Sequence, residues 1–459
     1  MSAAGGLRRR RLRLLAAAGG VALVTGCAGA GALTSGSDGG TTIVVAVVSN
    51  PQMTDAIALA DDFTEAHPDV DVDFVSLPEN ESRAKITASV ATGGGEFDVV
   101  MVSNYETAMW AENGWLVNLQ PYADATDDYD TDDFIAPVRE SLSHDGDMYS
   151  VPFYGESSFL VYREDLFDEA GLTMPERPTW PEVAELAAEI EAANPGMSGI
   201  CLRGLAGWGE NLAPLNTVIN TFGGQWFDED WNARLDSPEV REAVEFYVDL
   251  VRSHGQAGAA TSGFADCATR YGQGQAAMWY DATSMVNVVE SPEDSVTAGL
   301  NGYAPAPVAE TDASGWLYTW SLGIPSSSNH ADQAWEFIAW MTDKQYPYLV
   351  ADELGWERVP PGSRTSTYEI PEYAEVAAAF AEPTLSSMEV ADQDHTMAAP
   401  VPYDGIQFLA IPEFQDLGTR VGQQISAAIA GQISVDEALD QAQRYAETVG
   451  ESYQEEDVS

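Results

Sequence analysis

Apolar residues in the first part of the chain switch between strand-like and helix-like spacing. Residues 43–48 form a continuous apolar run that fits a buried strand, and residues 70–75 alternate as a half-buried strand does. Residues 53–66 and 82–92 show helical spacing, and 97–102 and 108–113 add a strand and a short helix. This strand–helix order predicts a parallel sheet with helices on its faces.

Polar side chains follow the first and third of these predicted strands. Asn50 and Gln52 come after residues 43–48, and Asn104, Tyr105 and Glu106 come after residues 97–102. The carboxyl ends of parallel strands share one edge of a sheet, where ligands bind. The sequence therefore predicts these side chains along one rim of a binding site.

Residues 151–158, which contain Pro, Gly and Glu156, separate this unit from a second one that begins with a strand at 159–162. Pro and Gly bend the backbone, and a carboxylate between two lobes is placed to meet a ligand. We interpret the stretch as a crossing between lobes. A surface turn with an incidental carboxylate is the alternative.

The second unit also alternates strands and helices. Helices are predicted at 180–193 and 240–253, and strands at 199–202 and 276–280; Arg203, Trp208 and Asn211 follow the first strand, and Asp281 follows the second. Trp320 lies on the aromatic face of a strand at 315–325, which precedes a helix at 331–342 and two C-terminal helices. We predict an N-terminal lobe of residues 42–153 and 283–328 and a C-terminal lobe of residues 154–282 and 329–459.

The first 26 residues are predicted to be an export signal. Arginines at 8–11 and 13 precede an apolar run at 14–24 that is too short to span a bilayer as a mature helix. Small residues then precede Cys27, as in a lipobox, which predicts lipidation of Cys27 and a flexible tether at 27–41. This places the protein outside the cytoplasm, lipid-anchored to the outer face of the cell membrane. An ordinary secretory signal with a chance cysteine is the alternative.

The chain is strongly acidic, with a net charge of −53. Removing residues 1–26 removes five arginines and no acids, which changes the net charge to −58, and the only lysines are Lys85 and Lys344. Phosphate neutralisation needs clustered Lys and Arg, so the composition excludes nucleic acid as a partner. It also argues against adhesion of the protein surface to anionic lipid.

Few residues point to metal or redox chemistry. Cys201 and Cys267 fall in the same predicted lobe, so they can form a disulfide or remain two buried thiols. The five His lack metal-ligand spacing, and the acidic run at 124–133 lacks the Gly and Glu that a calcium loop requires. We therefore predict no metal and no cofactor.

The polar and aromatic residues suit binding better than catalysis. The chain has no nucleophile elbow, phosphate loop, zinc-protease motif or dinucleotide fingerprint. Its Trp and Tyr residues with nearby carboxylates, Asn and Arg are typical of a site for a neutral polyhydroxylated ligand. A surface glycoside hydrolase using Glu106, Glu156 and Asp281 is the alternative from another class.

Several segments, taken in order, carry a resemblance to a known family. They include LPEN at 77–80, PFYGESS at 152–158, ICLRGLAGWGEN at 200–211, MWYDAT at 278–283 and GWERVPPGSRT at 355–365. Together they resemble the extracellular solute-binding proteins of ABC sugar importers, most closely the sorbitol/mannitol (polyol) binding members. The resemblance implies an α/β, two-lobed, periplasmic-binding-protein type II fold similar to maltose-binding protein, with the ligand between the lobes.

The resemblance also implies a function and a set of site residues. The protein would be a monomeric, non-enzymatic lipoprotein that captures a sugar alcohol and delivers it to the membrane permease; a mono- or disaccharide ligand is the alternative. Asn50-Pro51-Gln52 departs from the expected Asn-Gly-Asp, which can alter the preferred hydroxyl pattern. The predicted ligand-binding residues are Asn50, Tyr105, Glu106, Glu156, Arg203, Trp208, Asn211, Trp279, Asp281, Trp320 and Arg364.

Overall fold

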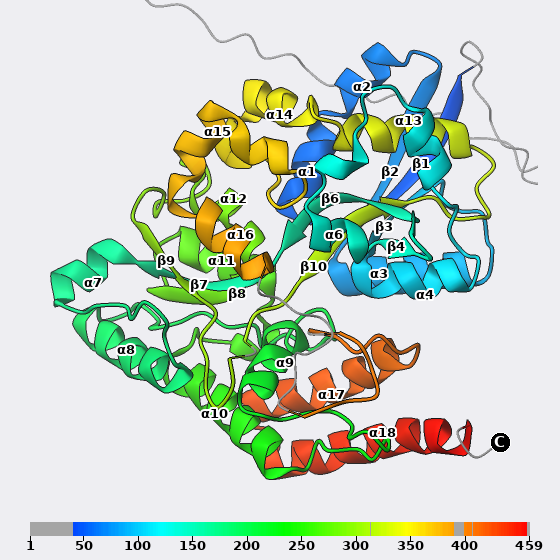
Figure 1. The fold of residues 1–459 in the computed structure, drawn as a ribbon. Helices are drawn as coiled ribbons and strands as arrows, with labels where there is room; N and C mark the ends of the chain where they lie inside the picture. Colours follow the sequence, from blue (N-terminus) through cyan, green and yellow to red (C-terminus); the bar gives the residue numbers. More distant parts are fainter. Residues whose placement is uncertain (1–39, 313, 390–398, 406, 457–459) are drawn as a thin grey trace, which may run out of the picture. The chain divides into compact units, whose positions relative to one another are not determined.

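The structure is a computed structural model that describes residues 40–312, 314–389, 399–405 and 407–456 (Figure 1). The predicted export signal, Cys27 and nearly all of the tether lie outside the described residues. The described chain contains two main sheets with helices packed around each of them.

The first sheet has five strands in the order β2-β1-β3-β10-β6. β1 pairs in parallel with β2 and β3, which confirms the parallel arrangement predicted for the N-terminal strands. β10 enters from much later in the chain and pairs antiparallel with both β3 and β6. The strands are β1 Thr41–Val48, β2 Val70–Leu77, β3 Val99–Ser103, β6 Ser150–Glu156 and β10 Tyr318–Gly323.

Side chains on the two faces of the first sheet pack against different helices. Ile86 and Trp110, from α3 and α4, pack with Val100 on one face, and Phe63 packs edge-on against Phe337 of α13 at 5.2 Å on the other. The predicted helix at 53–66 is two helices, because the chain turns at Leu59. The helices are α1 Pro51–Ala58, α2 Ala60–Ala66, α3 Glu79–Ala91, α4 Asn104–Glu112, α13 Ala331–Thr342 and α14 Tyr346–Leu354.

The second sheet has three antiparallel strands in the order β8-β7-β9. The predicted strand at 199–202 forms only isolated bridges, Ser198 to Ala276 and Cys201 to Trp279, beside β8. The elements of this part are β7 Ser158–Arg163, α7 Glu164–Ala170, α8 Trp180–Ala193, α9 Leu212–Thr221, α10 Pro238–His254, η2 Ala259–Thr261, α11 Phe264–Gly272, β8 Met278–Ala282, η3 Thr283–Met285, α12 Val286–Val289 and β9 Asn301–Pro305.

The strand pairing corrects the predicted lobe boundaries at three places. β6 stays in the first sheet to Glu156, so the chain changes sheet at Ser157 and not after residue 153. β9 pairs with β7 in the second sheet, although residues 283–328 were assigned to the N-terminal lobe. α13 packs on the first sheet, although residues 329–459 were assigned to the C-terminal lobe. The assignment of these elements to a lobe depends on pairing between segments far apart in the chain, which the local spacing of apolar residues cannot predict.

The remaining elements extend the two halves. No helix in the described ranges is long and apolar enough to cross a bilayer. The two long C-terminal helices, α17 and α18, pack together and against α10. The elements are α5 Gln120–Ala125, η1 Thr131–Asp133, α6 Ala136–Glu140, β4 Ser143–His144, β5 Asp147–Met148, η4 Trp356–Arg358, η5 Thr365–Glu369, α15 Pro371–Val376, η6 Ala377–Ala379, α16 Ala381–Glu389, α17 Phe414–Ile429 and α18 Val435–Glu456.

Candidate functional site

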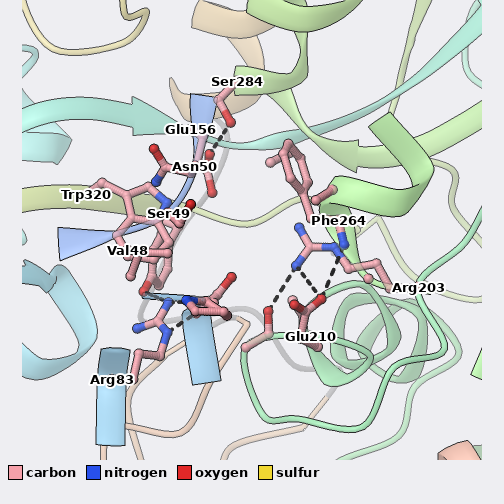
Figure 2. Close-up of a pocket in the computed structure, with 18 of the residues that line it drawn as sticks. Val48, Ser49, Asn50, Arg83, Glu156, Arg203, Glu210, Phe264, Ser284 and Trp320 are labelled. Atoms are coloured by element: carbon pink, nitrogen blue, oxygen red, sulfur yellow. Dashed lines mark hydrogen bonds and ion pairs between the residues drawn. The ribbon is translucent and has the colours of Figure 1, made fainter. Parts of the chain in front are cut away.

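A cavity of about 240 Å³ lies where the two sheets meet, and it is lined by residues from both of them (Figure 2). The first-sheet side consists of the end of β1, the start of α3 and parts of β6 and β10. The second-sheet side consists of the segment after Arg203, the first turn of α11 and the end of β8. Drug-sized ligands occupy pockets of roughly 300–1,000 Å³, so this cavity suits a smaller molecule.

Glu156 ends β6 in the cavity and is 6% exposed. Its carboxylate accepts a hydrogen bond from the hydroxyl of Ser284 at 2.5 Å. Burial raises the pKa of Glu156 to about 8, although the Ser284 hydroxyl and the charge of Arg203 oppose the shift. The side chain is therefore a buried acid that can accept or donate a hydrogen bond to a ligand hydroxyl.

Arg203 lies on the second-sheet side and is held by a buried ion pair. Its Nε donates to Asp281 Oδ2 at 2.8 Å, its Nη2 donates to the other carboxylate oxygen, and its Nη1 donates to the Gly209 carbonyl at 2.9 Å. The Phe264 ring lies 5.1 Å from the guanidinium carbon. Burial by itself would lower the pKa of Arg203, but Asp281 and Glu210 raise it above its ordinary value, so Arg203 stays charged.

In Figure 2, Arg83 of α3 lies on the opposite side of the cavity from Arg203. Its guanidinium contacts two indole rings. Its guanidinium carbon is 4.3 Å from the centre of Trp208 and 4.6 Å from that of Trp320. Glu79 accepts from its Nε and Nη2 at 3.0 and 2.9 Å. Because Trp208 belongs to the second-sheet half and α3 to the first, this stack joins the two halves beside the cavity.

Asn50 fixes the edge of the cavity at the end of β1. Its side-chain oxygen accepts from the Met53 N–H at 2.9 Å and so caps α1, while its amide donates to the Tyr154 hydroxyl at 3.0 Å. Capping explains why Asn follows the strand at this position. Gln52, also predicted on this rim, lines the cavity and donates to Asn287 at 2.8 Å.

The structure brings only part of the predicted site to the cavity. Asn50, Glu156, Arg203 and Trp320 line it. Asp281 and Trp279 are both 0% exposed and lie behind Arg203, where the Trp279 N–H donates to Asp281 at 3.1 Å. In this geometry Asp281 holds Arg203, and Trp279 in turn holds Asp281.

Three further predicted residues lie beside the cavity and do not line it. Trp208 stacks on Arg83, and the Tyr105 hydroxyl donates to the Ile411 carbonyl at 2.9 Å. Glu106 caps α4 by accepting from the Ser103 N–H at 3.0 Å, and it lies 3.6 Å from Arg83. Their positions at strand ends are as predicted, but the ligand contacts expected of them are not supported by this geometry.

Asn211 and Arg364 are structural residues. The Asn211 amide donates to the Gly422 carbonyl at 2.8 Å, away from the cavity. Arg364 is 1% exposed and donates to the carbonyls of Thr342, Asp130 and Tyr129, so its guanidinium is used in joining loops of the first half. Neither side chain lines the cavity.

Sequence reasoning missed several cavity residues. Arg83 lies on the helix predicted at 82–92, and Glu79 lies just before it, in the segment LPEN at 77–80; both line the cavity. Glu210 lies within the segment 200–211 that carried the resemblance, and Phe264 begins α11. Burial raises the pKa of Glu210 to about 7, further increased by Glu79 and opposed by Arg203.

The arrangement suits a small neutral ligand with many hydroxyl groups. Carboxylates and guanidinium groups offer acceptors and donors on both sides of the cavity, and Trp320 and Phe264 offer aromatic surface. Of the three carboxylates that a glycoside hydrolase would use, only Glu156 lines the cavity. Among the described residues, no group of three His, Cys, Asp or Glu side chains is placed to share a metal ion.

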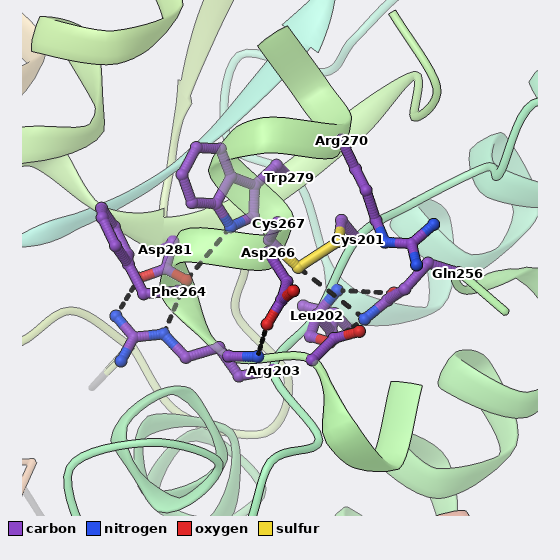
Figure 3. The surroundings of a disulfide bond; sticks show 12 residues. Cys201, Leu202, Arg203, Gln256, Phe264, Asp266, Cys267, Arg270, Trp279 and Asp281 are labelled. Carbon is purple, nitrogen blue, oxygen red and sulfur yellow. Dashed lines mark hydrogen bonds and ion pairs between the residues drawn. A yellow bond between two sulfur atoms is a disulfide. The ribbon is translucent and has the colours of Figure 1, made fainter. Parts of the chain in front are cut away.

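The two cysteines form a disulfide in the structure, with Cα atoms 5.7 Å apart, so the bonded alternative is the one observed (Figure 3). The bond lies in the second half, directly behind the part of the cavity wall that carries Arg203 and Phe264.

Comparison with known proteins gives consistent matches across most of the chain. The family model for bacterial extracellular solute-binding proteins matches residues 50–346. A mannitol-binding protein of Pseudomonas aeruginosa is 43% identical over 409 residues, which cover 89% of this chain and 93% of that protein.

Solved structures agree with these matches. The crystal structure of an ABC transporter solute-binding protein from Agrobacterium vitis S4 with bound D-mannitol has a TM-score of 0.87 and 45% identity, covering 90% of this chain and 99% of that chain. Maltose-bound MalE3 of T. maritima has a TM-score of 0.75 at 22% identity, covering 89% and 100%. The predicted α/β fold similar to maltose-binding protein is confirmed.

Proposed function

Because the chain belongs to the bacterial extracellular solute-binding protein family, we propose that it captures a sugar alcohol in the cavity between its two sheets. It then delivers the ligand to the membrane permease of an ABC importer. The protein acts by binding alone, as a monomer, and the chemistry of transport belongs to the importer.

One observation carries the proposal: the D-mannitol complex from Agrobacterium vitis S4 is 45% identical and covers 90% of this chain. The cavity supports it independently. Its volume of about 240 Å³ suits a small molecule, and charged hydrogen-bonding groups face it from both halves. A ligand that contacts both halves favours the closed arrangement, in which the importer can recognise it.

Titration calorimetry of the purified protein with a ligand panel tests the function. We expect saturable binding of D-mannitol or sorbitol, weaker binding of the shorter xylitol and arabitol because they fill fewer hydrogen-bonding positions, and the weakest binding of glucose and maltose. Tight binding of a sugar in preference to every alditol would support the alternative saccharide ligand. Release of reducing sugar from an oligosaccharide would contradict the proposal, since a binding protein leaves its ligand intact.

We also propose that Cys27 is lipidated and anchors the mature chain to the outer face of the cell membrane. The family is extracellular, and the residues before Cys27 have the pattern of a lipoprotein signal. Replacement C27A is expected to move the protein from the membrane fraction of cells to the soluble extracytoplasmic fraction. Unchanged membrane retention of C27A, together with a mass of the mature wild-type protein that lacks lipid, would contradict the anchor.

A further inference from the structure

The disulfide between Cys201 and Cys267 joins two segments that each continue into the cavity wall. Cys201 is two residues before Arg203, and Cys267 is three residues after Phe264. Arg203 and Phe264 both line the cavity, and the guanidinium carbon of Arg203 lies 5.1 Å from the centre of the Phe264 ring. The covalent bond therefore lies behind a contact between two groups that face the ligand (Figure 3).

The first turn of α11 is held on the protein core at few positions, which include the Phe264 ring, 5.3 Å from that of Trp279, and the adjacent buried residues Cys267 and Ala268. Phe264 is partly buried and faces the cavity, Ala265 and Asp266 are exposed, and Cys267 is the first fully buried residue of the helix. The following anchor, Tyr271, is one turn further on, where its hydroxyl donates to Asn301 at 2.9 Å. The disulfide is thus the covalent attachment of the turn that carries Phe264, and it acts together with the packing of the Phe264 ring against Trp279.

On the Cys201 side of the disulfide, hydrogen bonds fix the backbone between Cys201 and Arg203. Gln256 accepts from the Leu202 N–H at 3.3 Å and donates to the Leu202 carbonyl at 2.7 Å. The Cys201 N–H donates to the Met278 carbonyl at 2.8 Å. The backbone at Cys201 is therefore held in place, and the disulfide restrains the position of α11 relative to it.

Hydrogen bonds also join the two segments on the cavity side. The Gly204 and Leu205 N–H groups both donate to the Ser262 carbonyl, at 2.9 and 3.0 Å, and the Phe264 N–H donates to Glu210 at 3.2 Å. These bonds would remain after loss of the disulfide. Loss of the disulfide should therefore make the cavity wall that carries Arg203 and Phe264 more mobile without unfolding it.

We propose that the Cys201–Cys267 disulfide is a positioning element of the ligand site, which holds the Phe264 ring against Arg203 so that ligand affinity depends on the oxidised state of the pair. This inference rests on the proposed binding of a polyol in this cavity. Reduction would be a two-electron step in which an external dithiol is oxidised to its disulfide while Cys201 and Cys267 become thiols.

The test compares D-mannitol affinity of the oxidised wild type with that of C201A/C267A, each measured well below its unfolding midpoint. We expect about tenfold weaker binding by the variant. A double-mutant cycle with F264L distinguishes positioning from general stability: the two changes should be coupled by about threefold or more, because they act on the same contact. S284A, on a different wall of the cavity, serves as the additive control.

Reduction of the folded wild type with a phosphine provides a second measurement if the alanine variant does not fold, and the expected loss of affinity is the same. Unchanged affinity after reduction or substitution, or strictly additive effects with F264L, would overturn the positioning role. Failure of the oxidised wild type to bind any polyol would instead overturn the proposed function, and this inference with it.

Discussion

Replacement of Asp281 by asparagine is expected to lower the free energy of unfolding by about 3–5 kcal/mol, because it leaves the buried charge of Arg203 without its main partner. Asp281 is 0% exposed and accepts from Arg203, from the Trp279 N–H and from the Ala282 N–H. Asparagine has nearly the same shape, but it has no charge and can offer Arg203 only one acceptor oxygen. Glu210, at 3.9 Å, is too distant to replace the pair fully.

Urea unfolding of the wild type and D281N, followed by circular dichroism, measures this change. The matched control is D416N, which removes an exposed pair with Arg420 in α17 and should alter stability by no more than about 1 kcal/mol. Calorimetry on folded D281N should also show weaker polyol binding, because Arg203 loses its fixed orientation in the cavity. A D281N variant as stable as D416N would contradict the structural role assigned to the pair.

The first three strands of the fold could be predicted from the sequence because their pattern is local. Apolar runs, helical spacing and helix-ending residues identified β1, β2 and β3 and the helices between them, and their parallel pairing followed from the order. The predicted N-terminal lobe included β10, but the antiparallel pairing of β10 with β3 and β6 could not be predicted, since these strands are far away in the chain. For the same reason the predicted lobe boundaries did not place β9 with the second sheet or α13 with the first.

The site shows a similar division between local and non-local information. Asn50 was predicted because it follows a strand at the edge where ligands bind, and Glu156 because it lies in the crossing between the two units; both line the cavity. Asp281 also ends a strand, but only the three-dimensional structure shows that Arg203 lies between it and the cavity. Arg83 was missed because a helical arginine looks like an ordinary surface residue until Trp208 and Trp320 pack around it.

Arg364 shows why residue type alone misleads. The loop at 355–365 carries a segment similar to the polyol-binding family, and an arginine in such a loop suits a hydroxylated ligand. In the structure the guanidinium is buried among backbone carbonyls and lies 4.0 Å from the centre of the Phe134 ring. Arg364 therefore stabilises the loops around it, which the residue type and its place in the segment did not reveal.

Replacement of Glu156 by glutamine is expected to weaken polyol binding by about 1–3 kcal/mol, or roughly 5- to 150-fold in affinity. Glutamine keeps an acceptor for the Ser284 hydroxyl, so the wall of the cavity should remain in place. It replaces one of the two carboxyl oxygens with an NH2 group, which cannot accept a hydrogen bond from a ligand hydroxyl. Calorimetry with D-mannitol measures the change, and E245Q, an exposed glutamate of α10, is the matched control. Equal affinity of E156Q and wild type would remove Glu156 from the binding site.

The same substitution should change how the stability of the ligand-free protein depends on pH. The folded state holds the Glu156 proton up to a pKa of about 8, whereas the ordinary value is 4.5. Between these values the folded state binds more protons than the unfolded chain, so the free energy of unfolding falls as pH rises from about 5 to 8. Glu210, with its pKa raised to about 7, contributes in the same direction. E156Q should therefore show a shallower fall than wild type and E245Q in melts across this range, and parallel curves for all three would show that Glu156 is already ionised in the cavity at low pH.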